Sequence, residues 1–271
     1  MNRKLSKPGS FAIDVFSVAT VLRNHIKKSG LQEGKRMQSK DFYKRAIDNL
    51  KKGNYKEAVE YLNLVIYLNP TFADAYNKRG NCRSRFGKYK EAMSDCNKAL
   101  EINPNYAEAY VNRGVAYLAL GNSQEAIEDF TQAIHISPNC IDAYVNRGLA
   151  FSKLGNAHQA REDYTQALRI CPNDAIAYYN RGLAHDDIGD YKRAMEDYTQ
   201  VLQINLSDAD AYYNRSSIRY RLKDYQGAIE DLQNAVKFFI YQGDMAGYQK
   251  ASDILKSLSD LKLLQHHYEN W

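Results

Sequence analysis

Residues that could carry out catalysis or bind a metal are few and are not spaced for either task. His185 beside Asp186 and Asp187 is the one histidine–acid cluster in the repeated part of the chain, but equivalent positions carry Tyr117 and Phe151, which is typical of packing. No phosphate-binding loop, nucleophile elbow or zinc-protease pattern occurs. The cysteines lie 14, 44 and 31 residues apart without zinc-ligand spacing: Cys82, Cys96, Cys140 and Cys171. We expect a non-enzymatic protein without cofactor or metal.

Composition and charge exclude further classes. With 44% hydrophobic and 25% charged residues among 271, the chain is expected to fold. Residues 1–38 hold eight Lys or Arg and two acids, a net +6, so the other 233 residues sum to −1 and are not expected to bind nucleic acid. The most apolar stretch, residues 11–22, contains Asp14 and is too short to cross a bilayer. We expect free thiols and a cytoplasmic protein, either soluble or peripheral at a membrane surface.

One phrase, Ala-Tyr-x-Asn/Lys-Arg-Gly, recurs along the chain with a period of 34 residues. Its tyrosines are Tyr76, Tyr110, Tyr144, Tyr178 and Tyr212, and Phe42 extends the series backwards. This divides the chain into a basic arm (1–38), six units (39–72, 73–106, 107–140, 141–174, 175–208, 209–242) and a C-terminal segment (243–271).

Each unit carries two amphipathic helical patterns separated by a glycine, which predicts a helical hairpin. We expect these glycines to adopt the left-handed conformation that ends a helix: Gly53, Gly87, Gly121, Gly155 and Gly189. An asparagine with Glu or Gln three residues later predicts a capping box at Asn54, Asn122 and Asn156. Four prolines should end the second helices: Pro70, Pro104, Pro138 and Pro172.

Two further sets of residues predict how the helices of a hairpin meet. Glycines in the first helix should allow close approach to alanines in the second: Gly80, Gly114, Gly148 and Gly182 with Ala92, Ala126, Ala160 and Ala194. An arginine before each glycine is followed sixteen residues later by an aspartate, which predicts bidentate ion pairs: Arg79, Arg113, Arg147, Arg181 and Arg215 with Asp95, Asp129, Asp163, Asp197 and Asp231. In the first unit Arg45 faces Tyr61 instead. The alternative is that the arginines line a phosphate-binding groove.

This pattern resembles the tetratricopeptide repeat family. The residues that carry the resemblance in the third unit are Tyr110, Gly114, Tyr117, Gly121, Ala126, Phe130, Ala133 and Pro138. Terminal units depart from it at Ala46, Leu206, Ser216 and Lys223, as expected of an array whose ends face water. The resemblance implies an all-α, right-handed superhelical solenoid of antiparallel helix pairs, with a concave wall made by the first helix of each pair. The run from Phe238 to Leu258 resembles array ends in cyanobacterial members.

The same resemblance implies which side chains point into the concave groove. Position 6 of the units reads Lys44, Lys78, Asn112, Asn146, Asn180 and Asn214, and carboxamides there could hydrogen-bond to the backbone of a bound peptide. Neighbouring inward positions include Leu149, Leu183, Tyr179 and Tyr213, and the two tyrosines are either binding contacts or packed along adjacent helices. We therefore predict a scaffold, adaptor or assembly factor that binds an extended segment or helix of another protein.

Two alternatives concern partners. The clamp that grips chaperone C-terminal carboxylates is not expected, because Asp142 stands where that clamp needs a cation. In the alternative, the protein is a membrane-surface or nucleic-acid accessory protein that uses the basic residues 1–36. A helix is predicted at Ser10–Gly30, and it either covers the first unit or binds an anionic membrane surface or a partner. A second predicted helix, Gly247–Leu264, should cap the other end of the array.

Overall fold

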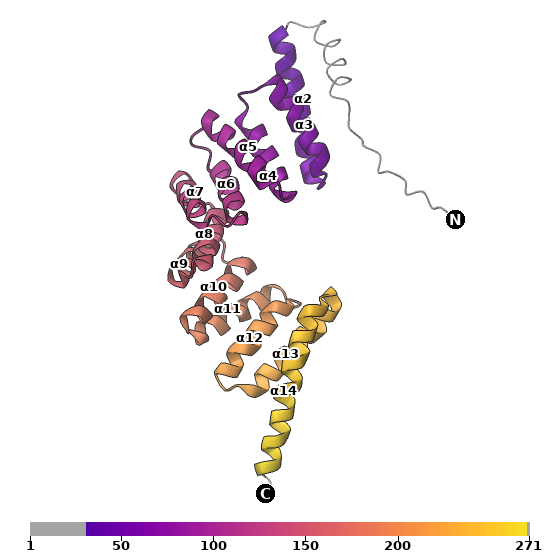
Figure 1. Ribbon diagram of the computed structural model, residues 1–271, viewed down its shortest axis with the longest axis vertical. Helices are drawn as coiled ribbons and strands as arrows, with labels where there is room; N and C mark the ends of the chain where they lie inside the picture. The colour runs from indigo at the N-terminus through magenta and orange to yellow at the C-terminus, as the bar shows by residue number, and fades with distance from the viewer. Residues whose placement is uncertain (1–30, 270–271) are drawn as a thin grey trace, which may run out of the picture. The chain divides into compact units, whose positions relative to one another are not determined.

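The computed structural model describes residues 31–269, and side chains within 38–259; over this range all secondary structure is helical, as predicted (Figure 1). The first helices of the hairpins are α2 (Leu31–Lys51), α4 (Ala73–Arg85), α6 (Ala107–Ala119), α8 (Ile141–Lys153), α10 (Ala175–Ile188) and α12 (Ala209–Arg221). The second helices are α3 (Tyr55–Leu68), α5 (Tyr89–Ile102), α7 (Ser123–Ile136), α9 (Ala157–Ile170), α11 (Tyr191–Ile204) and α13 (Tyr225–Gln242). The last helix is α14 (Met245–Glu269).

The chain divides into two compact parts, Met1–Pro104 and Asn105–Trp271, which we call unit 1 and unit 2. From here on, each 34-residue segment of the sequence is called a repeat or a hairpin. In unit 1, α2, α3, α4 and α5 pack one against the next. In unit 2 the same sequential packing runs from α6 to α14, and the first helices α6, α8 and α10 also touch one another in order. Consecutive first helices of unit 2 therefore lie side by side and can share one surface.

The ends of the array differ in part from the sequence expectation. Helix α2 begins at Leu31, eight residues before Ser39, where the first 34-residue repeat is predicted to start. Helix α14 covers the predicted capping segment and packs on α13 through Ala251, which is fully buried against Phe239 and Leu232. The predicted helix at Ser10–Gly30 lies outside the described residues.

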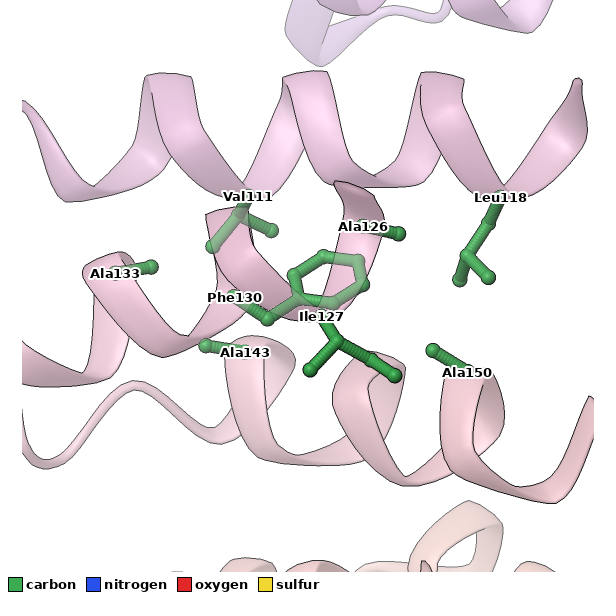
Figure 2. Packing of buried hydrophobic residues seen from close by; sticks show 8 residues of the cluster. All are labelled: Val111, Leu118, Ala126, Ile127, Phe130, Ala133, Ala143 and Ala150. Carbon is green, nitrogen blue, oxygen red and sulfur yellow. The ribbon is translucent and has the colours of Figure 1, made fainter. Parts of the chain in front are cut away.

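The core passes from one repeat into the next. Figure 2 shows the ring of Phe130, from α7, among small and branched side chains of α6 and α8. Phe130 is fully buried, as are Ala143 and Ala150 of the following first helix. Apolar burial stabilises by about 25 cal/mol per Å². Since Phe130 packs with residues of the next hairpin, neighbouring hairpins stabilise each other.

The glycine turns adopt the predicted conformation. All five have a φ between 72° and 85°, in the left-handed region that only glycine adopts without strain: Gly53, Gly87, Gly121, Gly155 and Gly189. In the last hairpin Lys223 occupies the same position with a φ of 67°. The backbone geometry of the turn is thus kept where the glycine is lost, at the cost of strain in a residue with a Cβ.

Replacing Lys223 by glycine should therefore stabilise the protein. The left-handed conformation costs a residue with a Cβ about 1 to 2 kcal/mol, and glycine avoids this cost. Glycine loses more conformational entropy on folding, so we expect the free energy of unfolding to rise by about 1 kcal/mol. Urea unfolding followed by circular dichroism measures the change. Lys237→Gly is the matched control, because Lys237 is exposed in the interior of α13, where glycine costs stability.

Second helices end as predicted, but their N-caps differ from the prediction. Asn69, Asn103, Ser137 and Cys171, each before a proline, have φ values of −138°, −133°, −131° and −126°, outside the helical region. The predicted capping boxes are wrong, because Asn54, Asn122 and Asn156 make no side-chain cap bond. The amide of Asn54 turns to Asn49 instead; nothing in the structure explains the other two. In four other helices, α10 to α13, the side chain of an N-cap aspartate does accept a hydrogen bond from a backbone N–H of the first turn: Asp174, Asp190, Asp208 and Asp224.

The small residues of the first helices have a different partner from the one predicted. A Cβ on Gly80 would lie 3.1 Å from the backbone oxygen of Ala92, as expected, but in later repeats the glycine faces an aromatic ring four residues beyond the alanine. A Cβ on Gly148 would lie 2.7 Å from Cε1 of Tyr164, and a Cβ on Gly114 the same distance from Phe130. The glycine makes room for the ring, and the alanines are buried beside it.

Candidate functional site

The predicted arginine–aspartate pairs are present in five consecutive hairpins. In the fourth, Nε and Nη2 of Arg147 on α8 donate to Asp163 on α9 at 2.8 and 2.7 Å, a bidentate contact. The equivalent bonds in the other four hairpins measure 2.6 to 3.0 Å. The aspartates are buried and the arginines are half-buried. Each pair therefore joins the two helices of one hairpin.

In four of these arginines the third nitrogen, Nη1, donates to a side chain of the preceding repeat. Within unit 2, Nη1 of Arg147 donates to Thr131 at 3.1 Å, and Arg215 likewise donates to Thr199 at 3.1 Å. In unit 1, Arg79 donates to Asn63 at 2.7 Å. We call each such set of arginine, aspartate and Thr or Asn a repeat latch. The guanidinium also lies over the tyrosine three residues earlier, 5.4 to 5.8 Å from the ring centre.

In the latch, burial and the hydrogen bonds from arginine shift the pKa of the aspartate in opposite directions. Burial raises the pKa of Asp163 and outweighs the lowering by the hydrogen bonds from Arg147, and Asp129 beside Arg113 behaves in the same way. The bond to the carboxylate raises the pKa of Arg147. In the second to sixth repeats the arginines are bound to aspartates of the same hairpin, which favours the predicted ion pairs over an arginine-lined phosphate groove. Arg45, in the first repeat, which lacks the aspartate, is exposed.

The candidate binding surface is formed by the first helices of unit 2, α6, α8, α10 and α12, and we call it the first-helix face. Asn112 is buried, and the other three asparagines of position 6 are half-buried. The amide of Asn146 donates to the backbone oxygen of Asp142 at 2.8 Å, and that of Asn214 to the hydroxyl of Tyr179 at 2.8 Å. The carboxamides of Asn146 and Asn214 have further donor and acceptor positions beyond these single bonds.

The apolar and aromatic residues predicted for this surface fall into two groups. Leu149 and Leu183 are each 37% exposed, which leaves apolar area for a partner. Tyr179 and Tyr213 are half-buried and pack edge-on, with Tyr179 5.8 Å from the ring of Tyr198. The two tyrosines thus pack along adjacent helices, and burial raises the pKa of Tyr179.

The two lysines of position 6 belong to unit 1. Lys44 is exposed on α2, and Lys78 is half-buried on α4 with its ammonium 4.0 Å from Asp74. The hydroxyl of Tyr43 also donates to Asp74, which ties the first helices α2 and α4 together.

Sequence reasoning missed a cavity of about 520 Å³ in unit 2, which we call the C-terminal pocket. Its walls come from α10, α12, α13 and α14, and Tyr213 and Asn214 of the first-helix face belong to its lining. Asp186 on α10 and Asp253 on α14 contribute carboxylates. The pocket could not be found from the repeat because α14 lies outside the 34-residue period.

His185 occupies a packing position on α10. It is buried, as its packing position predicts, and its Nδ1 and Nε2 lie 3.9 Å from Asp190 and Asp197. Burial lowers the pKa of His185 more than the carboxylates raise it, which favours the neutral ring. Within residues described by the structure, no group of three metal-binding side chains occurs, and no helix is long and apolar enough to span a membrane.

Stacked helical hairpins with a recurring turn glycine and an exposed first-helix surface define a helical repeat protein. Models of the tetratricopeptide repeat match residues 49–72, 73–106, 107–140, 139–207 and 185–244. The chain therefore belongs to the tetratricopeptide repeat family. No curated protein matches the sequence.

Solved structures show the same fold at low identity. PilF of Pseudomonas aeruginosa aligns with a TM-score of 0.70 at 18% identity, over 81% of this chain and 99% of that chain. YrrB, described as a protein of this family with an unusual peptide-binding site, aligns with a TM-score of 0.59 at 24% identity, over 72% and 99%. MamA aligns with a TM-score of 0.54 at 24% identity, over 64% and 94%.

Proposed function

We propose that this protein is a non-catalytic interaction scaffold, acting as an adaptor or assembly factor, that binds a segment of another protein along the first-helix face of unit 2. The observation that carries the proposal is the register of this face. The first helices α6, α8 and α10 touch in order, and α8 and α10 each present a carboxamide with an apolar side chain three residues later: Asn146 with Leu149 and Asn180 with Leu183.

The exposed parts of this face suit a polypeptide better than a small metabolite. Leu149 and Leu183 offer partly exposed apolar contacts on successive helices, and Ile176, about two turns before Leu183 on α10, is 66% exposed. The carboxamides of Asn146 and Asn180 can pair with the donors and acceptors of a peptide backbone. A bound segment would therefore gain apolar burial from the leucines and alignment from the amides.

The double substitution Asn146→Ala with Asn180→Ala should reduce capture of the partner by about tenfold, because two backbone hydrogen bonds of about 0.5 to 1.5 kcal/mol each are lost. A pull-down with the wild-type and variant chains, followed by mass spectrometry and titration of the captured protein, measures the loss. Gln124→Ala with Gln159→Ala is the matched control, since it removes two exposed carboxamides from the second helices α7 and α9.

Equal loss of capture in the control pair would place the binding surface elsewhere. Unchanged affinity in the Asn146→Ala, Asn180→Ala variant, with its thermal unfolding also unchanged, would contradict the role proposed for the first-helix face.

A further inference from the structure

The C-terminal pocket continues the first-helix face but has a different chemistry. Asn214 and Tyr213 of α12 belong to both surfaces, while the opposite wall is made by α14, which packs on α13. The pocket is thus closed on one side by the helix that ends the array. A segment lying along the first-helix face in unit 2 would reach this pocket at α12.

The lining combines acids with an apolar floor. Asp186 and Asp253 stand on different helices, and none of the residues that line the pocket is basic. The apolar residues of the lining include Leu232, which is 1% exposed, and Leu258. Arg221, whose guanidinium bonds to the hydroxyl of Tyr191 at 3.0 Å, acts on Asp186 from outside the lining.

Among the residues whose side chains the structure describes, no direct ion pair neutralises Asp186 or Asp253. Asp253 accepts a hydrogen bond from the amide of Gln249 at 2.8 Å. Burial raises the pKa of Asp186, and the repulsion from Asp187 adds to it, despite the opposing field of Arg221. A positive charge entering the pocket would therefore relieve a desolvated carboxylate.

We propose that the C-terminal pocket takes a lysine or arginine side chain of the bound protein segment, so the inference rests on the proposed function and names the chemistry of its partner. The aliphatic stem lies against Leu232 and Leu258, and the cationic head is held by Asp186 and Asp253. Long basic side chains suit such a site because they bury an apolar stem while their charge is paired.

The pocket can be tested without the partner. Butylguanidinium chloride reproduces the end of an arginine side chain, and n-butanol reproduces the stem without the charge. In ¹H–¹⁵N spectra of the full chain, we expect butylguanidinium to cause saturable shifts in the amides of Ser216, Ile254 and Ser257, and n-butanol to cause much weaker ones. Equal shifts with both compounds, or no saturable shift, would overturn the proposal.

Charge-neutral variants link the shifts to the two carboxylates. Asp186→Asn with Asp253→Asn should weaken butylguanidinium binding by about tenfold or more, as expected for the loss of charged hydrogen bonds. Glu162→Gln with Glu230→Gln, exposed on the second helices α9 and α13, changes the net charge equally and should leave binding unchanged. Binding that is equally weakened in both pairs would reflect net charge alone and overturn the proposal.

Two further outcomes separate this inference from the proposed function. If Asn146→Ala with Asn180→Ala abolishes partner capture while butylguanidinium binding fails, the scaffold role stands and the cation subsite falls. If spermidine binds far more tightly than butylguanidinium, and competes with no captured partner, the pocket serves a free polyamine and the proposed occupant is wrong.

Discussion

Arg147→Leu should lower the free energy of unfolding by about 3 kcal/mol, because it leaves the carboxylate of Asp163 buried without its partner. In the wild type that carboxylate receives two bonds from Arg147, and its side chain is 6% exposed. The substitution also removes the bond to Thr131 of the preceding repeat. Urea unfolding measures the loss, and amide hydrogen exchange in α8 and α9 shows whether it is local.

The destabilisation should depend on pH with a definite sign. Burial already raises the pKa of Asp163, and removal of Arg147 takes away the effect that opposes it. An acid whose pKa is raised on folding destabilises the folded state once the pH exceeds its pKa in the unfolded chain. The difference between wild type and Arg147→Leu should therefore shrink as the pH is lowered from about 7 to about 4.

Two variants make this prediction specific to the latch. Arg45→Leu removes an exposed arginine whose repeat has Tyr61 in place of the aspartate, and it should change stability by less than about 0.5 kcal/mol. Arg147→Met with Asp163→Leu removes both charges and should recover most of the loss, as buried pairs replaced by apolar groups often do. A loss below about 1 kcal/mol for Arg147→Leu would contradict a structural role for the latch.

The latch shows how far the period of the sequence reaches. A fixed separation of sixteen residues on two predicted helices was enough to pair Arg147 with Asp163, because the hairpin fixes which turns face each other. The third partner follows the same arithmetic, since Thr131, Thr165 and Thr199 each lie sixteen residues before an arginine. The sequence carries this spacing, but threonine is uncharged, so its type alone does not predict a partner for arginine.

Other features could not be derived from the period. The glycine register predicts a close approach, but whether an alanine or a ring fills it depends on side-chain rotamers, and only the structure places Tyr164 over Gly148. The burial of Asn112 likewise distinguishes it from Asn146 and Asn180, although all three share one repeat position. The C-terminal pocket depends on α14, whose residues have no equivalents in the other repeats.

Gly148→Leu should lower the free energy of unfolding by about 2 kcal/mol and the melting temperature by several degrees. The new Cβ would stand 2.7 Å from Cε1 and 2.9 Å from Cζ of Tyr164, closer than carbon atoms pack. The ring cannot swing aside, because Tyr164 is 1% exposed and its hydroxyl bonds to Ser152. Overpacking of this kind costs about 3 kcal/mol, of which better helix propensity offsets about 1 kcal/mol.

Two comparisons attribute that loss to the ring. Lys153→Leu places the same side chain at an exposed position of α8 and should leave the melting temperature nearly unchanged. Gly148→Ala alone should destabilise, but Gly148→Ala combined with Tyr164→Leu should cost less than the sum of the two single changes, since the smaller side chain gives the new methyl group room. Strict additivity in this pair, or an unchanged melting temperature for Gly148→Leu, would mean that the helices of the fourth hairpin do not need the glycine to pack.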